Sequence, residues 1–380
     1  MLGILNVEQT DRWGRFKEFA EQRIEPHAAD ADRTQTLAPE VLKGLAAAGY
    51  IGSSVPRRWG GGGMDAVCYG LLSHEIGRVC QSTRNLVAVE DMVCHAVVRA
   101  GSERQRDRWL GPVFSGEAVA AFAITEPEVG SDAAAVETTA TSAAGGFVLS
   151  GHKKWISFGQ IADVFLVLTR CEGALTAFLV ERDAPGLAVR PIRDLLGLRG
   201  SMLAELVFDD VHVTADDMVG PPGAGLAFVG SPALGLGRYS TAWGAVGLAQ
   251  SCLEASVGHA ARRRQHGAPI AEHQLVRRML ADMVTDVSAA RLLCHQAGVS
   301  VEKGDSGDLY RTLMAKYRSS TVARRAAEDA VQIHGALGVS GESPIERHYR
   351  DAKILEIIEG TTQIHQSIIG ECVGTLYQVP

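Results

Sequence analysis

A carboxylate lies in an apolar stretch near the end of the 380-residue sequence. In "EIIEGTTQ" (356–363), Glu359 follows two isoleucines and precedes a glycine. Burial among apolar groups disfavours the charged form of a carboxyl group, so such a glutamate would have a raised pKa and could act as a base near neutral pH. The alternative is a helix-end residue that faces water. Glu356 is the comparison within the segment, because no motif singles it out.

Two earlier segments have residue types that suit a polar, flat ligand. "AFAITEPEVGSD" (121–132) carries Thr125, Gly130 and Ser131, which can present hydroxyls and backbone amides. "GHKKWISFGQ" (151–160) places Trp155 where it can lie against a heteroaromatic ring. The alternatives are an ordinary Pro–Gly loop and a core tryptophan.

Two later segments suit phosphate groups. "RRRQHGAPIAEHQ" (262–274) is rich in arginine, whose guanidinium fork matches diphosphate oxygens, although an isolated arginine run is commonly a solvated patch. "QIHGALG" (332–338) has glycines that let the backbone approach a ligand, or that end a helix. We do not assign a catalytic role to His334.

The composition narrows the classes of function. Hydrophobic residues make up 46% and charged residues 21%, as in a soluble globular protein, and 37 basic against 44 acidic residues form no basic stripe for nucleic acid. No apolar stretch of about 18 residues predicts a membrane span. Seven scattered cysteines without CxxC spacing argue against a disulfide framework or a metal site. Together with the absence of a basic, signal-like N-terminus, they predict a cytoplasmic protein.

The hydrophobic periodicity predicts a multi-domain α+β fold. Residues 1–120 have helical spacing, and Pro26 is expected to end or bend the first helix. Residues 121–230 contain short β-branched and aromatic runs between turns, which predict a β-barrel domain. Residues 231–380 return to long helices, which suit a four-helix bundle.

The five segments, in this order and spacing, resemble the acyl-CoA dehydrogenase family. The strongest points are "TEPEVGSD", "KKWIS", "EHQLVRRMLADM" and "YRDAKILEIIEGTTQI", and the resemblance covers nearly the whole chain. It implies non-covalently bound FAD and electron-transfer flavoprotein as the electron acceptor. It also implies a homotetramer built as a pair of dimers.

The resemblance also implies which residues contact FAD. In the β domain and the last helix these are Phe122, Ile124, Thr125, Gly130, Ser131, Trp155, Ser157, Thr361 and Gln363. Contacts with the flavin of a neighbouring subunit are expected at Arg263, Gln265 and Gln274, and a further FAD segment at Gln332, Ile333, Gly335 and Ala336. Ser131, Arg238, Trp243 and Gly360 are expected at the substrate.

By the same resemblance, Glu359 is the base that removes the α-proton of an acyl thioester while a hydride leaves the β-carbon for the flavin. A minority of the family carries its base on an earlier helix, immediately before an arginine. Gly237 occupies that place here, before Arg238, so Glu359 is the candidate.

Departures from the family pattern bear on the substrate. Trp243 stands where many members have a small residue, so we expect a short or compact acyl group, unless Trp243 simply packs in the helical core. Ala336 and Ile358 are similar to a branch that acts on acyl or aminoacyl groups of carrier proteins in polyketide and nonribosomal peptide pathways. Acyl-CoA and carrier-protein thioesters both remain open.

Two other classes of function remain as alternatives. Flavin monooxygenases and nitroalkane-type oxidases share this fold, and those monooxygenases generally lack the glutamate of "EGT", so its presence here speaks against them. The other is a non-catalytic relative that serves as a binding protein, and the retained Glu359 and FAD segments weigh against it.

Overall fold

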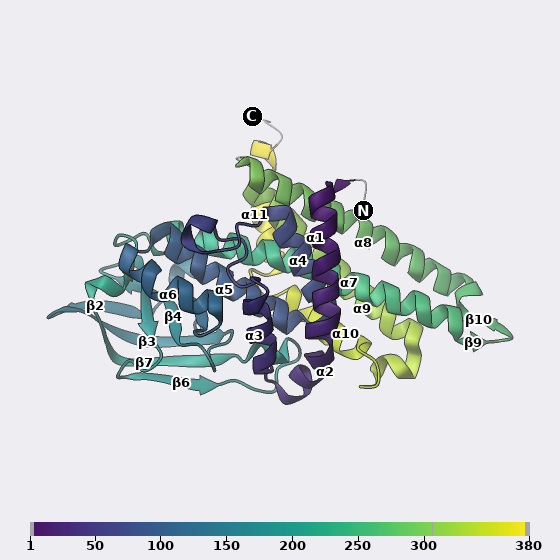
Figure 1. The fold of residues 1–380 in the computed structure, drawn as a ribbon, viewed down its shortest axis with the longest axis horizontal. Coiled ribbons are helices and arrows are strands. Elements are labelled where there is room, and N and C mark those ends of the chain that lie inside the picture. The colour runs from purple at the N-terminus through teal and green to yellow at the C-terminus, as the bar shows by residue number, and fades with distance from the viewer. Residues whose placement is uncertain (1–3, 306, 377–380) are drawn as a thin grey trace.

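The computed structural model describes residues 4–305 and 307–376, and it has a helical, a sheet-rich and a second helical part in chain order. In Figure 1 the sheet lies at the left, and the C-terminal helices extend to the right. The first helix crosses between them. This order matches the predicted α+β organisation.

The N-terminal part centres on two almost fully buried helices. The α-helices are α1 (Val7–Phe19), α2 (Glu25–Thr34), α3 (Pro39–Ala47), α4 (Ala66–Val79), α5 (Gln81–Ala100) and α6 (Glu103–Ser115). Helices α4 and α5 are buried along most of their length. A π-helical turn, Ala20–Ile24, joins α1 to α2 just before Pro26, where the proline was expected to interrupt the helix.

The middle part is one twisted, mostly antiparallel sheet. Its strands are β1 (Ala120–Ala123), β2 (Thr139–Ala143), β3 (Gly146–Ile156), β4 (Val164–Cys171), β5 (Ala174–Glu181), β6 (Leu187–Pro191), β7 (Ala204–Val213) and β8 (Met218–Val219). The strand order is β6-β7-β3-β2-β4-β5-β8, and β1 runs parallel to β4. The loops after β1 and β3 therefore leave the same sheet and carry the two candidate ligand segments.

The C-terminal part is built around one long helix. Its helices are α7 (Ser231–Arg262), α8 (Gln274–Lys303), α9 (Asp308–His334), α10 (Ile345–Leu355) and α11 (Thr362–Leu376). Helix α7 packs against α4, α5, α8 and α9, so it joins the two helical parts. The two-stranded hairpin of β9 (Arg264–Gln265) and β10 (Ala268–Pro269) projects at the end of the molecule opposite the sheet (Figure 1).

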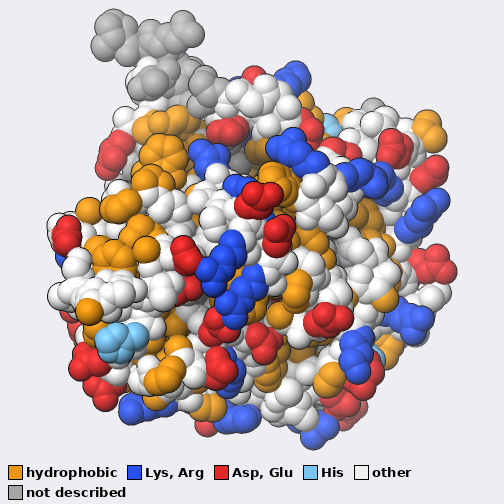
Figure 2. Space-filling model, turned by 60° about the vertical axis from the view of Figure 1, so that its left-hand side comes forward, with side chains coloured by type: hydrophobic (Ala, Val, Ile, Leu, Met, Phe, Trp, Pro, Cys, Tyr) orange, Lys and Arg blue, Asp and Glu red, His pale blue; other side chains and the backbone are white. Residues whose placement is uncertain are grey.

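Three observations describe the surface and the side-chain groupings of the described residues. On the face drawn in Figure 2, basic and acidic side chains are intermixed rather than gathered into one basic stripe. None of the helices in the described ranges is both long and apolar enough to traverse a bilayer. Those same ranges contain no group of three or more His, Cys, Asp or Glu side chains that could hold a metal ion.

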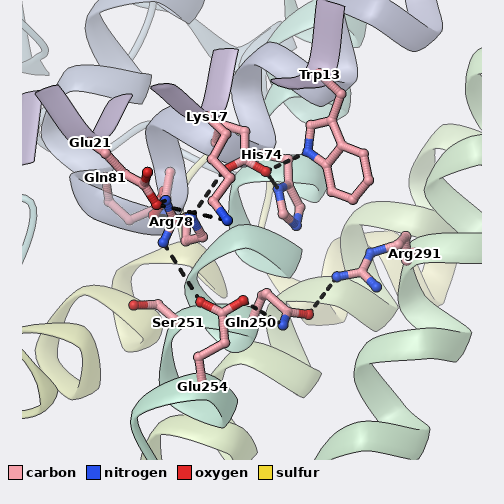
Figure 3. Close-up of polar contacts among 12 residues, drawn as sticks. Trp13, Lys17, Glu21, His74, Arg78, Gln81, Gln250, Ser251, Glu254 and Arg291 are labelled. Atoms are coloured by element: carbon pink, nitrogen blue, oxygen red, sulfur yellow. Dashed lines mark hydrogen bonds and ion pairs between the residues drawn. The ribbon is translucent and has the colours of Figure 1, made fainter. Parts of the chain in front are cut away.

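A buried polar network ties α1, α4, α7 and α8 together (Figure 3). The Glu75 carboxylate accepts hydrogen bonds from Trp13 and from Arg78 Nε, the latter at 2.9 Å, and its Oε1 lies 2.9 Å from His74 Nδ1. Arg78 also reaches Glu254 on α7 at 3.6 Å. Burial alone would raise the pKa of Glu75, but hydrogen bonds from His74 and Trp13 and the charge of Arg78 lower that pKa to about 2. The Glu75 carboxylate is therefore ionised and links α4 to α1 directly and to α7 through Arg78.

Replacing Glu75 by Gln should lower the apparent melting temperature, because the largely buried Arg78 loses its most buried carboxylate partner and keeps only the more exposed Glu21 and Glu254. The expected cost is roughly 3 kcal/mol. The Glu75 pKa is depressed in the fold, so its contribution is full above the ordinary glutamate pKa of 4.5 and disappears as pH falls toward about 2. Glu254→Gln is the matched control, since that side chain is 53% exposed and bonds to the same arginine. Equal effects of the two variants would contradict the assignment.

Candidate active site

The candidate base lies in a tight turn between α10 and α11. Glu359 has φ 57° and Gly360 has φ 94°, so two consecutive residues are in the left-handed region. That conformation is unfavourable for a glutamate and persists only where other contacts fix it. Glycine at 360 accommodates the second left-handed residue without strain.

Three side chains fix this turn by binding its carbonyl groups. Arg238 Nε of α7 donates to the Glu359 carbonyl at 3.1 Å, and His365 Nε2 of α11 lies 3.2 Å from the same oxygen. Lys316 Nζ of α9 donates to the Gly360 carbonyl at 2.6 Å. Burial lowers the pKa of His365 to about 3, so the ring is neutral and donates from Nε2. Three helices thus position one backbone turn.

The carboxylate of Glu359 is buried beside α7 at Gly237. A Cβ atom at position 237 would lie 2.5 Å from Glu359 Oε2 and 2.7 Å from Met92 Sδ, so only glycine leaves room for the carboxylate. Within the described residues, buried Oε2 has no hydrogen-bond partner. A minority of the family carries its base at the position of Gly237. Here the Glu359 side chain occupies the space that a side chain at position 237 would need.

The electrostatics suit a base. Burial raises the pKa of Glu359, and the charges of Arg238, Arg84 and Lys316 lower it, with a net upward shift. A carboxylate with a raised pKa, whose buried Oε2 has no hydrogen-bond partner among the described residues, accepts a proton readily from a weak carbon acid held against it. The sequence predicted a raised pKa from burial beside the isoleucines. Ile357 is 50% exposed, however, and the carboxylate lies against Gly237 and Met92 instead.

Glu356 has a different environment. Its carboxylate accepts from Arg324 Nε at 3.3 Å and from Lys353 Nζ at 2.9 Å. These ion pairs tie the end of α10 to α9. The glutamate that no motif singled out therefore has a structural role.

The loop after β1 is held by a buried ion pair. Lys153 Nζ lies 2.7 Å from Glu126 Oε1 and donates to the Ile124 carbonyl at 3.1 Å. The Thr125 carbonyl accepts from Lys154 N at 2.9 Å. Phe122, Ile124 and Thr125 thus lie at the end of β1 beside the end of β3, whereas Gly130 and Ser131 are exposed further along the loop.

Trp155 fits a flat ligand better than a protein core. It is 47% exposed and has φ 64°, and the Lys154 ammonium lies 5.0 Å from the ring centroid. A half-exposed indole has an accessible face on which a flat ring can stack. Two residues on, Ser157 Oγ accepts from Asn85 Nδ2 of α5 at 3.1 Å, which joins the sheet to the first turn of α5. These residues fit an isoalloxazine ring between sheet and helices.

The remaining expected FAD residues divide into two groups. Thr361 and Gln363 follow Glu359 directly, and Thr361 Oγ1 accepts from Ile364 N at 3.3 Å at the start of α11. Arg263, Gln265 and Gln274 are exposed at the hairpin of β9 and β10, which lies at the end of the molecule opposite the sheet (Figure 1). At the end of α9, Gln332, Gly335 and Ala336 are exposed and Ile333 is buried.

The structure does not bring Trp243 to Glu359. Trp243 is 1% exposed and packs edge-on against His74 of α4, with ring centroids 6.3 Å apart. A Cβ at Gly70 would lie 2.2 Å from its Nε1. Gly237 faces the carboxylate, and Trp243 contacts α4 instead, so its position agrees with the core alternative.

Two buried cations beside Glu359 were not identified from the sequence. Arg84 is 1% exposed and Lys316 is fully buried. Burial lowers the pKa of Lys316 to about 7 and that of Arg84 to about 10, while the charge of Glu359 raises both. Arg84 lies in the first turn of α5, which begins at Gln81.

Lys316→Met should move the acid limb of the pH–rate profile to higher pH, because loss of a neighbouring cation raises the pKa of Glu359 further. The deprotonated carboxylate is the active form, so the rate falls as pH drops through this pKa. In the unmodified protein the limb should lie above 4.5. Lys353→Met, which removes a cation from Glu356, is the control and should leave the limb in place. An unmoved or lowered limb in Lys316→Met would contradict this electrostatic assignment.

Comparison with known proteins gives one consistent family. Models of the acyl-CoA dehydrogenase N-terminal, middle and C-terminal domains match residues 7–117, 121–211 and 223–374. The human mitochondrial short-chain specific acyl-CoA dehydrogenase is 35% identical over 93% of this chain and 87% of that protein.

Solved structures of acyl-CoA dehydrogenases and of a related oxidase are also similar to this chain. A glutaryl-CoA dehydrogenase from Mycobacterium smegmatis, in complex with FADH2, is 27% identical with a TM-score of 0.93, over 98% of this chain and 95% of that chain. The prolyl acyl carrier protein oxidase AnaB is 26% identical with a TM-score of 0.92, over 97% of this chain and all of that one.

Proposed function

Because the chain belongs to the acyl-CoA dehydrogenase family, whose members dehydrogenate acyl thioesters with FAD, we propose that Glu359 is its catalytic base. In this reaction Glu359 Oε2 takes the proton from the α-carbon of the thioester. The electron pair of that C–H bond forms the Cα=Cβ double bond as a hydride leaves the β-carbon. FAD, when bound, supplies the acceptor for that hydride.

The observation that carries this proposal is the partnerless carboxylate over Gly237. Every other buried interaction around the turn involves carbonyl groups, which leaves Oε2 available. Within the described residues the Glu359 N–H also has no backbone acceptor, so it can donate to a thioester carbonyl oxygen. Such a donor stabilises the negative charge that develops there as the α-proton leaves. One residue then supplies both the base and a donor.

The FAD site is assigned to residues of two copies of the chain. We assign Trp155 and Ser157 to the side of the flavin ring that faces the sheet, with Thr361 and Gln363 beside the base. Arg263, Gln265 and Gln274 flank or lie in the hairpin of β9 and β10, which projects at the end of the molecule opposite the sheet (Figure 1). We assign them, with the segment at the end of α9, to the FAD of a second subunit. A homo-oligomer of at least two chains, and a tetramer by family resemblance, follows.

For the substrate we propose a compact acyl group on a phosphopantetheine arm, carried by an acyl carrier protein in preference to CoA. The likeness to AnaB and the residues Ala336 and Ile358 support the carrier protein. Ser131, Arg238 and Gly360 are the expected substrate contacts. Electron-transfer flavoprotein is the proposed electron acceptor, in keeping with the family.

Glu359→Gln should keep the bound yellow FAD but lose anaerobic bleaching by thioester by at least about a thousandfold, because the amide cannot take the α-proton. Glu356→Gln is the matched control, one turn earlier in the same segment, and should still bleach. Normal bleaching by Glu359→Gln would refute the assignment, and a colourless protein would favour a non-catalytic relative.

A panel of matched acyl groups on CoA and on carrier protein should decide the carrier. We expect faster bleaching, at equal concentration, by the carrier-protein thioesters. Faster bleaching by the CoA thioesters would reverse that choice. Rapid oxygen consumption by the substrate-reduced enzyme without another acceptor would favour the oxidase or monooxygenase class.

A further inference from the structure

Arginine side chains gather around Trp59, beside the end of α5. The guanidinium carbons of Arg106 and Arg58 lie 4.6 and 5.9 Å from the centroid of the Trp59 ring, within the range of a cation–π contact. Arg106 Nη2 also donates to the Gly101 carbonyl at 2.6 Å, two residues beyond the exposed Arg99. The basic patch, as we call it, consists of Arg57, Arg58, Arg99 and Arg106.

No acidic side chain pairs with this basic patch. None of the ion pairs among the described residues includes one of its arginines, whereas Arg104 and Arg108 of α6 pair with Asp216 and Glu181. Two guanidinium groups on one indole ring repel each other, and an anion beside them would relieve that repulsion. Because the whole chain carries a net charge of −7, the patch is a local exception on an acidic protein.

The basic patch borders a cavity of about 390 Å³. Ser54 and Met64 line this cavity, and the loop between them carries Arg57. His95 of α5 also lines it, and Arg99 follows His95 by four residues on the same face of the helix. The loop and the end of α5 therefore bring the arginines to one side of the cavity.

An exposed aromatic side chain lies near the same side. Phe228 is 58% exposed in the π-helical segment Gly225–Gly230, which packs against α5. Three residues further, the exposed Ser231 lines the cavity. The lining from α8 and α9 carries the acidic residues Glu302 and Asp308 instead. The cavity thus has a basic and aromatic side toward α5 and an acidic side toward α8 and α9.

The cavity also lies beside the candidate base. Leu236 of α7 lines the cavity and directly precedes Gly237, which faces the Glu359 carboxylate. Thr312 of α9 lines it as well, about 6 Å along the helix axis from Lys316, which binds the turn that follows Glu359. The basic patch is therefore connected through this cavity to the surroundings of the base.

We propose that the basic patch and Phe228 form the docking surface for an acidic face of the acyl carrier protein. This inference rests on the proposed function, and it names the residues that would select the carrier. The four cations are spread over a loop and two helices, whereas a phosphate site gathers its donors around one point. Arginine and aromatic side chains are also the types enriched at protein–protein interfaces. The acidic residues on the other side of the cavity would repel an acidic partner and so fix its orientation.

The test places one butyryl group on three carriers: a stand-alone acyl carrier protein with an acidic surface, CoA and pantetheine. Each thioester is mixed anaerobically with the FAD holoenzyme, and the rate of flavin bleaching is measured at low thioester concentration. The double variant Arg58→Glu/Arg99→Glu should lower this rate roughly 10- to 100-fold for the carrier-protein thioester and change it less than about twofold for the pantetheine thioester. Phe228→Ala should also slow only the carrier-protein thioester.

The dependence on salt separates docking from a general loss of structure. Bleaching of the unmodified enzyme by the carrier-protein thioester should slow as ionic strength rises, because salt screens exposed charges. The double variant should lose most of that dependence. A carrier protein whose acidic residues beside the phosphopantetheine serine are replaced by lysine should react faster with the double variant than the unmodified carrier does.

Arg193→Glu is the matched control for charge reversal. Arg193 is exposed and has no ion pair among the described residues. It follows β6, at the sheet edge opposite β8, and β8 is the strand at that other edge that contacts α5. This variant should leave all three bleaching rates unchanged. An equal loss for the carrier-protein and pantetheine thioesters in the double variant would overturn the proposal.

Two further outcomes would assign the basic patch to another partner. An equal loss for the CoA and carrier-protein thioesters would show that the arginines bind the phosphates of CoA. Unchanged bleaching, with a loss only of turnover with an external electron acceptor, would show that they bind that acceptor. Either result overturns docking of the carrier protein.

This inference and the proposed function fail in different ways. If no thioester bleaches the flavin, the proposed function falls. Binding of a fluorescently labelled, unacylated carrier protein to the Glu359→Gln holoenzyme needs no turnover and tests the docking surface alone. Equal binding with and without the Arg58→Glu/Arg99→Glu changes would overturn the docking surface and leave Glu359 as the base.

Discussion

The placement of one desolvated carboxylate is the constraint on which the rest of the site depends. The pKa of a glutamate stays raised where water and hydrogen-bond donors are excluded from its carboxylate. Its position must then be fixed by contacts to its backbone. The protein meets both conditions by binding the backbone of the turn through Arg238, His365 and Lys316. The left-handed conformation of Glu359 is thereby imposed from three helices.

Helix α7 serves two opposite needs along its length. On the face toward Glu359 and Arg84 it presents Gly237 and Gly244, whose missing side chains leave room for the charged groups of other elements. Toward α4 it presents Trp243, which fills the core between the two helical parts. The glycines leave space for charged side chains, whereas Trp243 fills the space between α7 and α4. Packing of Trp243 therefore fixes the position of α7, while the space beside Glu359 stays open.

The sequence predicted the three-part fold because each part has its own hydrophobic period, and the family comparison confirms that prediction. It also singled out Glu359, since a carboxylate between isoleucines and glycine is unusual. Arg84 and Lys316 escaped notice because an arginine or lysine in a helix is ordinarily exposed, and their burial depends on contacts between α5, α7 and α9. Trp243 was assigned to the acyl space because a sequence does not show which face of a helix meets which neighbour. The individual FAD contacts remain predictions.

The hairpin of β9 and β10 affects how catalytic activity depends on the separate subunits of an oligomer. If Arg263 and Gln265 serve the flavin of a second chain, each catalytic centre is composite, and its two halves are encoded at distant places in the same gene. Damage to the hairpin of one subunit then silences its neighbour and spares itself. Two defective chains, one lacking the base and one lacking the hairpin arginine, can assemble into a mixed dimer with one intact centre.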